Sequence, residues 1–296
     1  MLVTMKEIVD QASKGNYAVA APNVSSELDA RAFVEVAEEM NAPLILDVGY
    51  ASVTDLFFTG QMLRQLAMQS SIPIAINLDH GGAAAEIIQA IHAGFTSVMI
   101  DRSYLSFEEN VAQVKELADI AHAAGLSVEA ELGHVGQAAQ YDVDRDAALT
   151  SAEDALKFIE LTGVDCLAVA IGTAHGAYPE GFKPYLDFDR LVEIKKATNQ
   201  FPLVLHGSSG TSNEQIEKAC KLGINKVNIA NDLCKAASIA VQSADLQGQN
   251  AYGVYDVLKE GAKAKLREMI QVYGSKDKAW LPVCKGIAKK ETTMIE

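Results

Sequence analysis

Three histidines follow short apolar runs that have the composition of buried strands, and each is followed at once by glycine. They are His80 after IPIAINLD, His175 after CLAVAIGTA and His206 after FPLVL. Side chains at the carboxyl ends of parallel strands converge on one face of an α/β fold, where small ligands bind. Three neutral imidazoles would hold a zinc ion and leave coordination positions open. A single such histidine is more often held by hydrogen bonds at a strand end, but three in the same context favour a metal centre.

Carboxylates stand at the ends of the same predicted strands. Asp79 directly precedes His80, so strand alternation places the two side chains on different sides, one to bind metal and one to work as an acid beside the substrate. Glu129 and Glu131 lie two apart in VEAELG, on one face of a strand. A buried glutamate needs a salt bridge or a metal, and both interpretations are open here. Asp101, at the end of SVMID, could join Glu131 in a second metal position.

The segment HGSSG at 206–210 is a small-residue loop before a predicted helix, SNEQIEKAC. The backbone amides of Gly207 and Ser209 could hold a phosphate at the amino end of that helix. In the next unit, the polar side chains of Asn228 and Asn231 could supply further contacts. The segment alone is a plain turn about as often as a phosphate loop. Phosphate sites in barrels frequently use the last two loops, which favours the phosphate interpretation.

The chain has 296 residues, 49% of them hydrophobic and 22% charged, with a formal net charge of −14. This negative charge argues against nucleic-acid binding, although a phosphorylated metabolite needs only a local cradle. We find neither a run of about 20 apolar residues nor a signal peptide, so we expect no membrane partner. The scattered cysteines favour reduced thiols and a cytoplasmic location; they are Cys166, Cys220, Cys234 and Cys284.

Apolar runs alternate with amphipathic stretches from end to end, which predicts parallel strands buried on both faces. The eight expected strands are 17–23, 44–48, 74–79, 97–101, 127–132, 166–171, 203–207 and 226–229. Several helical stretches open on a serine cap and close on glycine. We therefore predict one (β/α)8 TIM barrel over 1–274, with a doubly wound open sheet as the alternative. The tail, 275–296, loses periodicity and is expected to be mobile or packed on a partner subunit.

The combined motifs resemble the class II ketose-bisphosphate aldolases, the family of the fructose- and tagatose-bisphosphate enzymes. The resemblance covers nearly the whole chain, with the motifs in family order. The motifs are LDHG at 78–81, VMID at 98–101, VEAELG at 128–133, AVAIGTAHGAY at 168–178, PLVLHGSSG at 202–210 and LGINKVNIANDL at 222–233.

The resemblance implies a metal-dependent aldolase that reversibly cleaves a phosphorylated ketose to dihydroxyacetone phosphate and an aldehyde, through a zinc-stabilised enediolate. His80, His175 and His206 would bind Zn²⁺, and Asp79 would be the catalytic acid and base. Asp101 and Glu131 match acids of a second divalent position, and the family allows a monovalent cation. Four further residues match those that hold dihydroxyacetone phosphate: Gly176, Gly207, Ser209 and Asn228. We also expect a homodimer or homotetramer.

The chain departs from the family where substrate choice is made. Asn77 stands where the family usually has histidine, and Arg102 and Tyr104 alter its DGSH segment. Ala230 replaces an acid after the last strand, which makes NIANDL closer to the tagatose-bisphosphate branch. The loop after GHVG, at 136–141, lacks the family's acid, since Ala138 and Ala139 stand there.

Two other functions fit the same motifs. A metal-dependent sugar-phosphate epimerase or isomerase would form the enediolate without breaking a carbon–carbon bond. A non-catalytic sugar-phosphate-binding protein would keep the metal and the phosphate cradle only. The presence of Asp79 argues against the binding protein, which has no need of an acid.

The missing loop acid generates a prediction about Asp142 and Asp144, the nearest carboxylates in the loop. If either removes the proton at the dihydroxyacetone phosphate carbon, its replacement by Asn should slow exchange of that proton with deuterated water. This exchange isolates the step from carbon–carbon cleavage. Parent exchange rates in both Asp142→Asn and Asp144→Asn would move the role to Tyr141 or to a neighbouring subunit.

Overall fold

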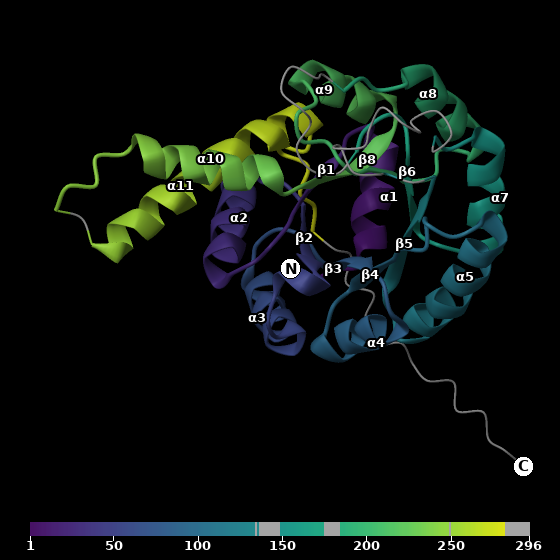
Figure 1. Cartoon of the computed structure of the whole chain (residues 1–296), viewed down its shortest axis with the longest axis horizontal. Coiled ribbons are helices and arrows are strands. Elements are labelled where there is room, and N and C mark those ends of the chain that lie inside the picture. Colours follow the sequence, from purple (N-terminus) through teal and green to yellow (C-terminus); the bar gives the residue numbers. More distant parts are fainter. Residues whose placement is uncertain (134, 136–148, 175–183, 249, 282–296) are drawn as a thin grey trace, which may run out of the picture.

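The computed structural model describes residues 1–133, 135, 149–174, 184–248 and 250–281, in which eight parallel strands alternate with helices (Figure 1). Each strand coincides with one of the predicted apolar runs, with ends that differ by at most a few residues. The strands are β1 (Val19–Pro22), β2 (Leu44–Gly49), β3 (Ile74–Gly81), β4 (Ser97–Ile100), β5 (Ser127–Leu132), β6 (Cys166–Val169), β7 (Leu203–Leu205) and β8 (Ile224–Ile229).

The strands form a nearly closed barrel. They are hydrogen-bonded in the order β1-β8-β7-β6-β5-β4-β3-β2. At the remaining seam between β1 and β2, Asn23 forms a parallel bridge with Asp47, and the amide of Val24 donates to the Asp47 carbonyl at 2.8 Å. The edges of an open sheet could not meet in this way. The predicted (β/α)8 barrel is therefore confirmed, and the doubly wound alternative is excluded.

The helices begin and end at the residue types that helix-capping rules predict. Serine caps such as Ser106 and Ser212 accept hydrogen bonds from the first turns of their helices, and Gly163 ends a helix at a φ of 71°. The helices are α1 (Met5–Gly15), α2 (Glu27–Glu39), the 3-10 helix η1 (Tyr50–Ser52), α3 (Leu56–Gln69), α4 (Ala84–Ala93), α5 (Phe107–Ala123), α7 (Ala152–Thr162), α8 (Phe188–Ala197), α9 (Asn213–Leu222), α10 (Asn231–Ser243) and α11 (Ala251–Tyr273).

The first helix closes the amino end of the barrel. Its buried face, formed by Met5, Ile8, Val9 and Ala12, packs in one cluster with side chains from β1, β2, β3, β6 and β7. Side chains that alternate with these on the strands pack against the outer helices in a separate, larger cluster. The floor is thus sealed with apolar side chains, and the opposite end, where the strands finish, remains for ligands.

The last two helices form a hairpin that extends away from the ring of helices (Figure 1). The two helices lie side by side, and α11 returns along α2 before it ends at Gly274, whose φ is 77°. No helix in the described part of the chain is long and apolar enough to cross a membrane.

The start of the predicted tail runs along the barrel. The amides of Asp277 and Ala279 donate to the carbonyls of Met40 and Asn41, at 3.0 and 2.9 Å. Trp280 packs on the same apolar cluster as α1. The rest of the tail, 282–296, lies outside the described residues, so its mobility or its packing on a partner stays a prediction.

The barrel floor generates a stability prediction. Ile8 is fully buried against the strand side chains, so Ile8→Ala should lower the free energy of unfolding by about 2–5 kcal/mol through lost burial and a cavity. Gln11→Ala, an exposed position on the same helix, should change it by less than about 0.5 kcal/mol. Denaturant unfolding measures both. Equal effects in the two variants would show that α1 does not close the barrel.

Candidate active site

The described candidate residues meet at the carboxyl end of the barrel. Asp79 and His80 come from β3, Glu131 from β5, and Asn228 from β8, whereas Asp101 and His206 directly follow β4 and β7. Two groups of side chains could each hold a metal ion, because within each group the potential ligand atoms lie within 4.8 Å of one another. The groups are Asp79, His80 and His206, and His80, Asp101 and Glu131. The structure therefore brings together residues that are far apart in sequence.

Asp79 and His80 lie on the same side of the strand, which corrects the alternation that the sequence predicts. The φ of His80 is 51°, in the left-handed region that non-glycine residues seldom adopt. The pairing of β3 with β4 also shifts register between Leu78 and Gly81. This local turn directs both side chains into the site, where Asp79 Oδ1 lies 3.9 Å from His80 Nε2.

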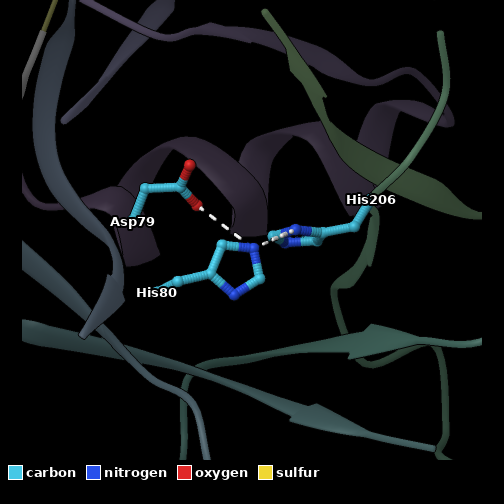
Figure 2. A group of neighbouring side chains, drawn as sticks. All are labelled: Asp79, His80 and His206. Carbon is cyan, nitrogen blue, oxygen red and sulfur yellow. Dashed lines mark hydrogen bonds and ion pairs between the residues drawn. The ribbon is translucent and has the colours of Figure 1, made fainter. Parts of the chain in front are cut away.

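The two imidazoles each point one ring nitrogen toward the other (Figure 2). His80 Nε2 and His206 Nδ1 are 3.1 Å apart, and the rings are nearly perpendicular at 78°. Two nitrogens bound to one tetrahedral zinc ion would lie roughly 3.3 Å apart, given bonds of about 2.0–2.1 Å. The observed spacing fits a shared metal ion.

Carboxylates hold the far nitrogen of each imidazole. His80 Nδ1 lies 2.8 Å from Asp101 Oδ2, and His206 Nε2 lies 2.9 Å from Glu129 Oε1. Such contacts fix the tautomer and the orientation of metal-binding histidines. Asp101 thus orients the His80 ring. It also belongs to the second group of potential metal ligands, with His80 and Glu131.

The site has a strongly negative electrostatic environment. Burial would lower the pKa of His80, but Asp79, Asp101 and Glu131 outweigh burial and raise it to about 10. Burial raises the pKa of Glu131 to about 8, and the charge of Asp101 adds to that rise. Both shifts have the direction expected where carboxylates crowd a buried position and favour a bound cation.

Asp79 is held as an anion between two amides. Asn23 Nδ2 donates to Asp79 Oδ2 at 2.7 Å, and Asn228 Nδ2 donates to Asp79 Oδ1 at 3.0 Å. Burial would raise the pKa of Asp79, but the charges of His80 and His206 lead those that lower it to about 2. An ionised, oriented carboxylate of this kind can accept a proton. Asn23 is a site residue that sequence reasoning missed, and its place at the end of the first expected strand, 17–23, was the available signal.

A buried charge network supports His206 from below. Glu129 Oε2 accepts from Lys226 Nζ at 2.8 Å, and Lys226 Nζ also lies 3.2 Å from Asp47 Oδ2. Asn77 Nδ2 in turn donates to Asp47 Oδ1 at 2.9 Å. The salt-bridge interpretation of Glu129 is thereby confirmed. Charged residues inside the apolar runs LILDVG and INKVNI were the available signal for Asp47 and Lys226.

Lys226 and Glu129 are ionised because each charge is balanced by the other. Burial would lower the pKa of Lys226, but Asp47 and Glu129 raise it well above its usual range. Burial would likewise raise the pKa of Glu129, but Lys226 and His206 lower it. Burial raises the pKa of Asp47 to about 8, and the charges of Asp79 and Glu129 add to that rise although Lys226 opposes it. The ionised pair of the network is therefore Lys226 with Glu129. All three side chains are fully buried, so each depends on its partners.

The predicted phosphate loop, 206–210, requires glycine at position 207. A Cβ on Gly207 would lie 2.5 Å from the Ala174 carbonyl oxygen, and the φ of Gly207 is 65°. Ser208 Oγ donates to the Asn228 carbonyl at 2.9 Å, which ties this loop to β8. Asn231 is exposed at the first turn of α10. Ser209 lies between Ser208 and the next glycine, in the loop that precedes α9.

Four predicted site residues lie outside the described part of the chain. They are His175, Gly176, Asp142 and Asp144. Their roles as third imidazole ligand, substrate contact and loop acids stay predictions.

The fold and the site define a class of protein: a (β/α)8 enzyme with a cation site beside an ionised acid. The family model of class II fructose-bisphosphate aldolase matches residues 3–278. The fructose-bisphosphate aldolase of Thermus caldophilus is 36% identical, and the match covers 94% of this chain and 100% of that protein.

Solved structures of aldolases are also similar to this chain. The YdjI aldolase from Escherichia coli K12 is 34% identical with a TM-score of 0.85, and the match covers 95% of this chain and 100% of that one. A putative fructose-1,6-biphosphate aldolase from Coccidioides immitis is 26% identical with a TM-score of 0.81, covering 92% and 96%. The chain belongs to the class II fructose-bisphosphate aldolase family. It is an aldolase, a lyase that performs metal-dependent aldol cleavage.

The buried network generates a prediction about Lys226. Lys226→Met removes the cation shared by Asp47 and Glu129 and should cost about 3–5 kcal/mol of unfolding free energy. Denaturant unfolding of the metal-free protein measures this cost without any contribution from bound metal. Lys235→Met, at an exposed position of α10, is the matched control. Equal stability of the two variants would contradict a role for Lys226 in holding the network.

Proposed function

We propose that the enzyme reversibly cleaves a phosphorylated ketose to dihydroxyacetone phosphate and an aldehyde, with Zn²⁺ as its metal. The observation that carries this proposal is the convergence of His80 Nε2 and His206 Nδ1 beside the ionised Asp79. Imidazole nitrogens whose rings are held by carboxylates suit zinc well, and zinc would displace the proton that His80 carries in the metal-free protein. His175 would supply the third imidazole.

The bound zinc ion would polarise the ketone and stabilise the negative charge that develops when the carbon–carbon bond breaks. Asp79 would accept the proton of the hydroxyl beside that bond in cleavage and return it in condensation. Asn23 and Asn228 would keep the carboxylate aimed at this hydroxyl, because each amide holds one of its oxygens. Glu129 would hold the His206 ring in place.

The phosphate of dihydroxyacetone phosphate would lie against the loop after β7. Gly207 lets this loop pack closely against the backbone of Ala174. Ser209, Asn228 and Asn231 would supply polar contacts to the phosphate. Gly176 would complete this side of the site. Asp101 and Glu131 would hold a second divalent ion, and a monovalent cation would balance the phosphate.

Three further properties belong to the same proposal. The enzyme would act in the cytoplasm, in keeping with the free thiols of Cys166, Cys220 and Cys234. It would assemble as a homodimer or homotetramer. The 1–274 segment would be the catalytic domain.

Incubation with dihydroxyacetone phosphate and a panel of aldehydes, with and without a chelator, tests the reaction. An aldolase forms a new ketose phosphate, and the chelator abolishes its formation. Proton exchange without any condensation product would instead identify an epimerase or isomerase, and binding without exchange a sugar-phosphate-binding protein.

The role of Asp79 generates a prediction about turnover. Asp79→Ala should lower turnover by roughly 10²- to 10⁴-fold, the range for a lost general acid or base, while the protein keeps its metal. His206→Ala is the comparison, because it should lower metal content as well as activity. Steady-state kinetics and elemental analysis separate the two. An unchanged rate in Asp79→Ala would move the acid–base role to another residue, and full metal occupancy in His206→Ala would refute the ligand assignment.

A further inference from the structure

Arg102 lies just after β4, next to Asp101, and is buried, with 4% of its surface exposed. Its Nε donates to Gln113 Oε1 on α5 at 2.8 Å, and its Nη1 donates to the carbonyls of Gly81 and Asp101, at 3.2 and 2.6 Å. Each of these described acceptors is uncharged. A buried cation without a carboxylate partner is costly, so ion pairing does not explain why an arginine stands here.

The Gly81 carbonyl lies at the irregular end of β3. The register of β3 against β4 shifts between Leu78 and Gly81, where β3 has one residue more than β4. This extra residue makes a β-bulge, and the bulge contains Asp79 and His80. The φ of 51° at His80 is a conformation that persists only where surrounding contacts fix it. The direction of both site residues therefore depends on what holds the end of the bulge.

Arg102 links the end of the bulge to the carboxylate that orients His80. The Gly81 carbonyl accepts from the amide of Asp101, at 3.3 Å, and from Arg102 Nη1. A Cβ on Gly81 would lie 2.7 Å from the Met99 carbonyl oxygen, so the bulge ends in direct contact with β4. The same Nη1 holds the carbonyl of Asp101, whose carboxylate lies 2.8 Å from His80 Nδ1. One nitrogen thus acts on His80 through its backbone and through its ring.

We propose that Arg102 is a positioning residue for the metal site, which clamps the carbonyls of Gly81 and Asp101 and so keeps His80 and Asp79 directed into it. This inference rests on the proposed metal-dependent reaction and adds a residue that touches neither metal nor substrate. A guanidinium suits the role because its planar fork holds several donors in a fixed geometry. Arg102 also departs from the DGSH segment of the family, so the clamp belongs to this chain rather than to the family motif.

Metal affinity tests the clamp without any turnover. The metal-free protein is titrated with Co²⁺, a divalent ion that binds the ligands of zinc sites, and visible absorption is followed. Arg102→Met keeps an unbranched apolar stem but donates no hydrogen bond, so the dissociation constant for Co²⁺ should rise roughly 10- to 100-fold, the range for lost support of a metal ligand. Arg64→Met, at a partly exposed position of α3, is the matched control and should bind as the parent does. Parent affinity in Arg102→Met would overturn the proposal.

Two milder variants keep the test decisive if Arg102→Met does not fold. Gln113→Leu removes the outer anchor of the guanidinium at an exposed position of α5, and it should weaken Co²⁺ binding by less than Arg102→Met. Arg102→Lys keeps the charge on a single nitrogen, which cannot hold both carbonyls and Gln113 in the geometry of the fork. Its affinity should lie between those of the parent and Arg102→Met. Parent affinity in both milder variants would overturn the clamp.

A purely structural role for Arg102 predicts a different pattern. It would lower the free energy of unfolding of the metal-free protein but leave the Co²⁺ dissociation constant and the Co²⁺ absorption spectrum unchanged, and this result would overturn the proposal. With metal at saturation, the clamp predicts a lower kcat in Arg102→Met, because Asp79 is no longer held in direction. The KM for dihydroxyacetone phosphate should change little, since the proposed phosphate contacts lie on the loops after β7 and β8.

The parent protein separates a failure of the clamp from a failure of the proposed function. A parent that binds no Co²⁺ would refute the proposed metal site, and the clamp with it. Co²⁺ binding that weakens in Arg102→Met, in a parent that forms no aldol product, would support the clamp and refute the proposed reaction. Aldol product in the parent with equal Co²⁺ affinity in all variants would refute the clamp alone.

Discussion

The site depends on one buried ion pair. Lys226 is fully enclosed in the barrel and contacts Glu129, and Glu129 holds the far nitrogen of His206. Without Lys226, the Glu129 carboxylate would be an unpaired buried charge, which is too costly to remain beneath an imidazole. The cation deep in the barrel thus permits the carboxylate, and the carboxylate fixes the ring. A carboxylate also holds the second imidazole, because Asp101 contacts the far nitrogen of His80.

Much of the fold follows from the sequence because the barrel repeats one unit. Continuous apolar runs identify strands buried on both faces, and serine and glycine mark the ends of helices, so local rules act independently in each unit. The active-site residues found this way, such as Asp79, His80 and His206, all lie at the carboxyl ends of strands. Topology alone then brings them together.

The residues that sequence reasoning missed act through geometry that no local pattern encodes. Asn23 reaches Asp79 only because β1 lies next to β2 at the closing seam, and the partners of Lys226 come from strands on other sides of the barrel. The side on which His80 lies was also mispredicted. Strand alternation assumes extended backbone, whereas the φ of 51° at His80 turns its ring toward Asp79. A rule for regular strands cannot anticipate where a strand end departs from regular geometry.

Pairing of the first strand with the last has a consequence for the order of folding. β1 pairs with β8, so the two ends of the chain must meet, and loop-closure entropy makes such non-local pairing slow. His80 and His206 stand 126 residues apart, and the Asn228 contact to Asp79 spans 149. The metal-binding groups therefore come together only when the ring is nearly complete. Because a cation can bind only where these groups have met, recovery of metal binding during refolding would report these long-range contacts rather than the first collapse.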